Sequence, residues 1–243
     1  MPDDLANQIA LITGASRGIG RALALRLAQA GCDLALVART KDDLEAVADE
    51  TGACGVRTLV LPADITDDRQ VEAMVQAAMV RLGSVSILIN NAGVAPARAA
   101  HGKAPMEAWD RMLATCLRAP MVLTHLLLPD MLAHRRGAIV NLASLSARTA
   151  RSGEAAYAAA KAGLVAFSRA LFAEVRNSGV KVVAVCPGLV DTQFIPPNRR
   201  VDRSTFLKPD DVAEMIVRLL TMPAHACPTE LVLEPQFDPE PPR

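Results

Sequence analysis

The first apolar run of the sequence, IALIT (9–13), leads through the turn TGASRGIG (13–20) into a stretch of helical period. Gly14, Gly18 and Gly20 therefore fall where a strand passes into a helix. At such a turn the helix N-terminus offers free N–H groups and the positive end of its dipole to a phosphate, and glycine lets that phosphate approach the backbone. The spacing G-x-x-x-G-x-G differs from the commoner dinucleotide pattern, so a plain tight turn is the alternative for the triplet taken alone.

Short apolar runs alternate with helical stretches along the chain, which predicts repeated βαβ units. The predicted strands are 9–13, 33–38, 56–62, 85–90, 137–143, 180–186 and 230–234. The predicted helices are 18–30, 41–51, 67–82, 105–134 in two pieces, 153–177 and 208–221. Most strands are apolar throughout, as expected of strands buried on both faces of a sheet. We therefore predict a single α/β domain over 1–243, with helices on both faces of a parallel sheet and a proline-rich tail at 235–243.

Charge and cysteine usage exclude several classes of partner. Lysine and arginine total 26, as do aspartate and glutamate, so no basic field favours nucleic acid or an anionic membrane. The five cysteines are scattered without metal-ligand spacing, which predicts neither a metal site nor disulfides. No apolar run reaches about 18 residues and the acidic start MPDDLANQ is unlike a targeting peptide, so we expect a cytoplasmic protein without a membrane span.

The end of the second strand indicates which nucleotide is bound. In NAD-binding sheets an acidic residue about 20 positions after the glycines binds the ribose 2′-hydroxyl, whereas an arginine accommodates the 2′-phosphate of NADP. This sequence has Arg39 there, and Arg17 lies inside the glycine turn. Because the planar guanidinium fork suits phosphate oxygens, we predict that NADP(H) is preferred over NAD(H). Solvated surface charge is the alternative for either arginine alone.

Further motifs follow the glycine turn in a fixed order. They are NNAG (90–93), Ser144, the pair Tyr157 and Lys161 in the pattern Y-x-x-x-K, PG (187–188) and Thr192. Together with TGASRGIG, this ordered set resembles the short-chain dehydrogenase/reductase family over about residues 9–235. The resemblance implies a Rossmann-type, doubly wound domain with a seven-stranded parallel sheet. It also implies reversible hydride transfer between a nicotinamide cofactor and a carbonyl or alcohol.

Site residues are carried over from the family position by position. Tyr157 would be the general acid/base, Lys161 its partner and a ribose ligand, and Ser144 the donor to the substrate oxygen. The implied cofactor-binding residues are Gly14, Ser16, Arg17, Gly18, Ile19, Gly20, Arg39, Asp64, Ile65, Asn90, Asn91, Ala92, Gly93, Tyr157, Lys161, Pro187, Gly188, Val190 and Thr192. The candidates on the substrate side are Val94, Leu189 and Phe194.

The chemistry of the residues agrees with these roles. Tyr157 is the only tyrosine of the chain, and Lys161 lies on the same helix face at i+4. A phenol with a pKa near 10 is a sluggish acid/base at neutral pH, and a neighbouring ammonium lowers that pKa. Ser144 follows a strand at the carboxyl edge of the sheet, where it could hold a carbonyl oxygen beside the phenol. The alternative is an amphipathic helix that carries a tyrosine and a lysine incidentally.

Two departures from the family pattern keep alternatives open. Cys116 occupies the position where the family often has an asparagine for proton relay, so the relay could run through Thr115 or turnover could be low. The chain ends in TELVLEPQ and a proline-rich extension, without the glycine-rich ending of many acyl-carrier reductases. The leading hypothesis is an NADPH-dependent carbonyl reductase or alcohol dehydrogenase. The alternatives are a 3-oxoacyl-thioester reductase and a low-turnover, cofactor-sensing module.

The substrate side is predicted from two loops. Residues 189–209 should form a lid over the substrate. Its arginines, Arg199, Arg200 and Arg203, are expected to be solvated charges more often than ligands of an anionic group. Its apolar residues, Phe194, Ile195 and Phe206, would either contact the substrate or pack the lid onto the body of the protein. Residues 94–105, with His101, would form the opposite lip, and we assign no role to His125, His134 and His225. The partner is expected to be a small carbonyl or alcohol. The family resemblance implies a homodimer or homotetramer built on helices 105–134 and 153–177.

Overall fold

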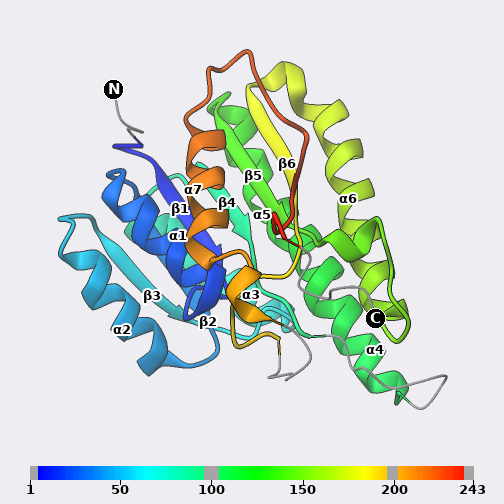
Figure 1. Ribbon diagram of the computed structural model, residues 1–243. Coiled ribbons are helices and arrows are strands. Elements are labelled where there is room, and N and C mark those ends of the chain that lie inside the picture. Colours follow the sequence, from blue (N-terminus) through cyan, green and yellow to red (C-terminus); the bar gives the residue numbers. More distant parts are fainter. Residues whose placement is uncertain (1–4, 96–103, 196–201, 238–243) are drawn as a thin grey trace.

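The computed structural model describes residues 5–95, 104–195 and 202–237 of the chain. Its centre is a seven-stranded sheet in the order β3-β2-β1-β4-β5-β6-β7, with every neighbouring pair parallel (Figure 1). The strands are β1 (Ile9–Thr13), β2 (Asp33–Ala38), β3 (Thr58–Pro62), β4 (Ile87–Asn90), β5 (Gly137–Leu142), β6 (Val180–Pro187) and β7 (Glu230–Leu233). The predicted Rossmann-type α/β fold with seven parallel strands is confirmed.

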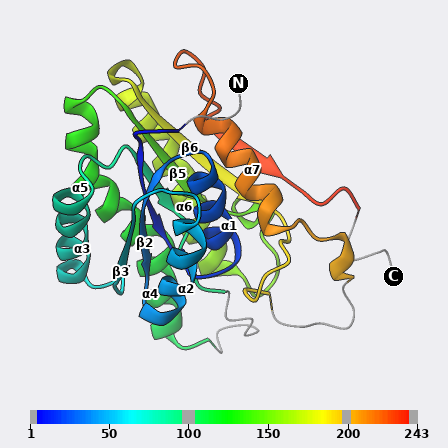
Figure 2. The same cartoon turned by 90° about the vertical axis from the view of Figure 1, so that its left-hand side faces the viewer.

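Helices cover both faces of the sheet. One face carries α1 (Gly18–Gln29), α2 (Lys41–Gly52) and α7 (Pro209–Leu220), and the other carries α3 (Asp68–Arg81), α5 (Ala119–Ala133) and α6 (Ala155–Val175). Figure 2 shows α3 and α5 on one side of the strands and α1 and α7 on the other. Because each strand packs side chains into both layers, two separate apolar cores form. Leu11 of β1 is buried in one core and Ile12 in the other.

The strand order places a ligand crevice at the middle of the sheet. From β1 the chain runs outward through β2 and β3, then crosses back to β4 on the other side of β1. At such a reversal the loops that leave the two central strands diverge, and in open α/β sheets ligands bind there. The carboxyl ends of β1 and β4, at Thr13 and Asn90, therefore lie at the floor of the expected site.

The long helix predicted over 105–134 is interrupted. It consists of α4 (Met106–Leu113), a π-helical segment η1 (Ala114–Arg118) and α5, which follow one another directly. A π-helical turn carries one extra residue, which rotates the following side chains, and such turns often lie at functional sites. Cys116 lies in this segment, so its surroundings differ from those in a regular helix.

The structure bears on two expectations from the sequence, that the chain has no membrane span and that it has no disulfides. Among the described residues, Met106–Ala133 is the one span long and apolar enough to cross a membrane. Of its most apolar window, 44% is buried within the protein, and a core helix passes the same test of length and composition. All five cysteines are free.

Parts of the predicted loops lie outside the described residues. These are His101, Arg199, Arg200 and the last six residues of the tail, 238–243. The part of the predicted lid that the structure describes is tied to the body by a parallel bridge between Val190 and Leu207.

Candidate active site

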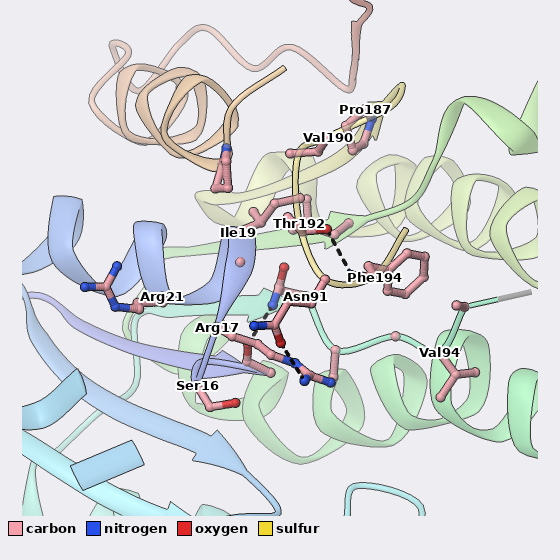
Figure 3. A pocket seen from close by; sticks show the side chains of 18 of the residues that line it. Ser16, Arg17, Ile19, Arg21, Asn91, Val94, Pro187, Val190, Thr192 and Phe194 are labelled. Carbon is pink, nitrogen blue, oxygen red and sulfur yellow. Dashed lines mark hydrogen bonds between the residues drawn. The ribbon is translucent and has the colours of Figure 1, made fainter. Parts of the chain in front are cut away.

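A cleft of about 2020 Å³ opens along the carboxyl edge of the sheet. Its walls come from the segments that follow β1, β2, β3, β4, β5 and β6, together with the starts of α6 and α7. Figure 3 shows Ser16, Arg17 and Arg21 toward one end of the cleft and Val94 and Phe194 toward the other. The cleft is large enough for a dinucleotide with a small substrate beside it, since typical small-molecule pockets measure about 300–1,000 Å³.

The glycine turn has no room for side chains. Gly14 has a φ of +65°, and a Cβ on it would lie 3.0 Å from the Ala92 Cα. A Cβ on Gly20 would lie 2.1 Å from the Gly14 carbonyl oxygen. The Asn91 side chain locks this arrangement, because its amide donates to the Thr13 and Gly14 carbonyls at 2.9 and 3.1 Å. The bare backbone and the N-terminus of α1 thus form a cradle of the kind that accepts a phosphate.

The two arginines predicted to bind the nucleotide, Arg17 and Arg39, both line the cleft. Arg17 is exposed, and its Nη1 donates to the Gln193 side chain at 3.1 Å. Arg39 is exposed and has neither a hydrogen bond nor an ion pair with a described residue. It lies near Asp64, whose pKa is lowered by hydrogen bonds from Thr66 and further by the Arg39 charge. An arginine without a partner at this edge is free to receive an anion.

Ser144, Tyr157 and Lys161 meet on the wall formed by β5 and α6. Tyr157 is 8% exposed and Lys161 is 4% exposed, and all three residues line the cleft. The Lys161 ammonium donates to the Leu142 carbonyl at the end of β5 and lies 5.8 Å from the centre of the Tyr157 ring. The Ser144 hydroxyl accepts a hydrogen bond from the Ser146 N–H at 3.1 Å, which fixes its direction.

The acidity of Tyr157 differs from the expectation drawn from the sequence. Burial raises the pKa of its phenol, and this effect outweighs the lowering by the Lys161 charge and by a hydrogen bond with the Ser144 side chain. The predicted influence of the ammonium is present, but the desolvation that overrides it depends on tertiary packing. The phenol is therefore protonated at neutral pH, which suits a proton donor.

Cys116 is fully buried against this wall. It belongs to a small apolar cluster with Met112, Tyr157 and Ala160, and its Sγ would lie 3.8 Å from a Cβ added to Gly93. Its neighbour Thr115 lines the cleft. The thiol thus lies behind the tyrosine, where a weak hydrogen-bonding group offers little to a proton relay.

The end of the cleft that carries Val94 and Phe194 includes several apolar side chains. Val94, Leu189 and Phe194 line it as predicted, together with Ile195. The Phe194 ring lies 6.2 Å from the Tyr157 ring and so covers the phenol from the lid side. Phe206 is instead buried in the body of the protein, which fits the packing alternative.

Arg203 differs from the favoured prediction of a solvated loop charge. Its guanidinium binds the Asp191 carboxylate at 2.6 Å and the carbonyls of Thr192 and Ile195 at 2.9 and 3.0 Å. These bonds hold the described start of the lid in place.

Two predicted cofactor residues do not line the cleft. Gly20 lies beneath the turn, where its role is the close approach to Gly14. Asn90 is buried between β4 and β5 and donates from Nδ2 to Asn141 at 2.7 Å, while Asn141 donates to Ser168 at 2.8 Å. Asn90 therefore ties the central strands to α6 and supports the site indirectly.

Several residues that line the cleft were not predicted from the sequence, and two of them bear on the acid/base residues. Glu154 and Ser146 both line the cleft beside the tyrosine. The available signal was spacing: Glu154 precedes Tyr157 by three positions, which places the two on one helical face, and Ser146 follows Ser144 by two.

Comparisons with known proteins agree with this geometry. Residues 8–201 match the family model for short chain dehydrogenase. The chain is 32% identical over 231 residues to an uncharacterized oxidoreductase of Staphylococcus aureus, which covers 95% of this chain and 98% of the relative. A short-chain type dehydrogenase/reductase from Mycobacterium marinum has a TM-score of 0.88 at 27% identity, with 96% of each chain covered. A metagenomic short-chain oxidoreductase solved in complex with NADP has a TM-score of 0.84 at 30% identity, covering 96% of this chain and 99% of that one.

Proposed function

Because the chain belongs to the short-chain dehydrogenase family, we propose that it is an NADPH-dependent oxidoreductase that interconverts a carbonyl compound and the corresponding alcohol. The observation that carries this proposal is the joint position of Ser144, Tyr157 and Lys161. The three side chains lie on one wall of the cleft, with the tyrosine and lysine almost fully buried. A phenol, an ammonium and a hydroxyl that share a desolvated wall form an acid/base site.

Ser144, Tyr157 and Lys161 would have different roles in carbonyl reduction. Ser144 would donate a hydrogen bond to the carbonyl oxygen and so hold it beside the Tyr157 phenol. Tyr157 would give its proton to that oxygen, and the nearby Lys161 ammonium would stabilise the phenolate left behind. When bound, the nicotinamide nucleotide would supply the hydride in this direction and accept it in the other. Phe194 would exclude water from the reacting carbon.

The residues of the glycine turn fit a dinucleotide. The backbone of Gly14 and Gly18 would cradle the pyrophosphate at the N-terminus of α1. Asp64 and Ile65 would lie by the adenine, and Pro187, Gly188, Val190 and Thr192 would line the nicotinamide side. Arg17 and Arg39 would bind a 2′-phosphate, and the NADP complex of the metagenomic relative supports this choice of cofactor.

The proposal also covers the oligomeric state of the protein and the role of residues 189–209. We infer a homodimer or homotetramer, because Leu113 and Met121 expose apolar surface on the stretch from α4 to α5. Light scattering coupled to size-exclusion chromatography tests this, and a monomer at micromolar concentration would contradict it. We also propose a cytoplasmic location, because the free cysteines fit a reducing compartment. Residues 189–209 would act as the substrate lid, and the rest of the chain would serve as one nucleotide-binding domain.

A panel of aliphatic and aromatic ketones and aldehydes, followed by NADPH absorbance, tests the activity. At least one class of carbonyl compound should be reduced. In a separate titration, the Kd for NADPH should be lower than the Kd for NADH. No carbonyl-dependent NADPH oxidation across the panel, with NADPH bound, would refute the activity. Equal or weaker binding of NADPH than of NADH would refute the cofactor preference.

A further inference from the structure

A buried carboxylate lies beside the acid/base residues and has no role in the chemistry described so far. Glu154 is 7% exposed, lines the cleft and precedes α6 as its N-cap residue. Its side chain makes no capping bond to the helix. It accepts a hydrogen bond from the Ser146 hydroxyl at 2.9 Å instead.

The carboxylate lacks a cationic partner. Glu154 forms no ion pair with any of the described residues, and its Oε1 has no hydrogen-bond donor among them. Because Oε1 keeps its acceptor capacity on a residue that lines the cleft, a group that approaches from the cleft could donate a hydrogen bond to it. Among the other charged residues that line the cleft, Lys161 donates to the Leu142 carbonyl, and Arg203 and Lys208 are bound to Asp191. Arg111 also lines the cleft.

A short chain of hydrogen bonds links this carboxylate to Ser144. Ser146 donates from its backbone to the Ser144 hydroxyl and from its side chain to Glu154, so one residue holds both groups. Glu154 also directly precedes the first turn of α6, which carries Tyr157, and both residues line the cleft. The Glu154 charge also contributes to the raised pKa of Tyr157, as the smallest of the causes after burial and Cys116.

We propose that Glu154 accepts a hydrogen bond from a hydroxyl group on the carbon next to the reacting carbon. The substrate class is then α-hydroxy ketones, and 1,2-diols in the reverse direction. This inference rests on the proposed carbonyl reduction at Tyr157. The same carboxylate disfavours substrates with an anionic group at that carbon, such as 2-oxo acids, by charge repulsion.

The test compares two ketones that differ only at the proposed contact. 2-Hydroxycyclohexanone and 2-methylcyclohexanone have the same shape, and kcat/KM for each is measured with saturating NADPH in the full-length protein. Because the hydroxyl also activates the carbonyl chemically, the quantity that matters is the change of the ratio between wild type and variant. Glu154→Met removes the acceptor, Glu154→Gln keeps a neutral acceptor, and Glu174→Met, on the exposed side of α6, is the matched control.

The preference for the hydroxy ketone should fall about ten- to hundredfold in Glu154→Met, the range expected for a hydrogen bond to a charged group. It should fall less in Glu154→Gln and stay at the wild-type value in Glu174→Met. An unchanged ratio in Glu154→Met, or faster reduction of 2-oxobutanoate than of either ketone by the wild type, would overturn the inference. If Glu154→Met does not fold, the same comparison with Glu154→Gln decides.

Binding of a diol separates this inference from the proposed activity. trans-Cyclohexane-1,2-diol, added to the protein with NADP⁺ present, should raise the Tm of the wild type and of Glu174→Met but not that of Glu154→Met. If neither ketone is reduced and the diol still shows this pattern, the carboxylate contact stands and the proposed reaction fails. If both ketones are reduced and the diol stabilises all three proteins equally, the reaction stands and the role of Glu154 fails.

Discussion

Replacing Gly20 with alanine would place a methyl group against the backbone of the glycine turn. The new Cβ would lie 2.1 Å from the Gly14 carbonyl oxygen and 2.6 Å from the Asn91 side-chain nitrogen. A main-chain oxygen cannot rotate away, so the start of α1 and the turn must separate. Overpacking of this kind costs up to about 3 kcal/mol. The helix-forming advantage of alanine over glycine returns about 1 kcal/mol.

The net loss of about 2 kcal/mol corresponds to a fall in Tm of roughly 4–8 °C for a chain of this size. Because the displaced groups form the proposed phosphate cradle, the Kd for NADPH should rise by at least about tenfold, or ~1.4 kcal/mol. Differential scanning calorimetry and a fluorescence titration with NADPH measure the two quantities.

Gly52→Ala is the matched control. Gly52 ends α2, and a Cβ there would have no heavy atom within 4 Å. This variant should keep or slightly raise the Tm and bind NADPH with unchanged affinity. If Gly20→Ala melted and bound NADPH like the Gly52→Ala protein, the close packing of the turn against α1 would be wrong.

Three further outcomes follow from the site. Arg39→Leu should weaken NADPH binding by about tenfold and leave NADH binding unchanged, because this exposed arginine, which has no partner among the described residues, would contribute one charge-assisted contact. Equal losses for both nucleotides would contradict its proposed role at the 2′-phosphate. Cys116→Asn should raise kcat if the buried thiol limits proton resupply, and an unchanged kcat would remove Cys116 from the relay. Burial raises the pKa of Tyr157, so the rate of carbonyl reduction at saturating NADPH should persist into weakly alkaline solution and fall only as pH rises through that pKa. The rate of alcohol oxidation should instead increase with pH. A reduction rate that already falls below neutral pH would contradict the assignment of Tyr157 as the proton donor.

Much of the fold was predictable because each strand corresponds to an apolar run in the sequence. The ranges predicted for β1 and β2 coincide with those observed, and each of the other five strands differs by one or two residues at one end. Helix ends and strand ends fray and depend on caps, which local pattern determines only approximately. The π-helical segment around Cys116 was not predicted, because an extra residue in a helical turn depends on the packing of α4 and α5 and leaves the apolar period nearly intact.

The candidate site shows where local sequence stops being informative. The order and spacing of the glycine turn, Ser144, Tyr157 and Lys161 indicate the wall of the cleft, because each lies at or just beyond the carboxyl edge of a strand or on the helix that packs there. The net acidity of Tyr157 could not be predicted, since it depends on how deeply tertiary packing buries the ring. Glu154 was overlooked for a similar reason: a glutamate before a helix usually faces solvent, and its burial is a property of the fold.

The most direct test of the central claim is the effect of Tyr157→Phe on both catalysis and cofactor binding. Removing one hydroxyl keeps the buried ring and takes away the proposed proton donor. We predict that kcat for carbonyl reduction falls by at least about a hundredfold, in line with the usual contribution of a general acid, while the Kd for NADPH stays within about threefold of the wild-type value. A Tyr157→Phe protein that retains wild-type kcat with NADPH bound would contradict the assignment of Tyr157 as the proton donor.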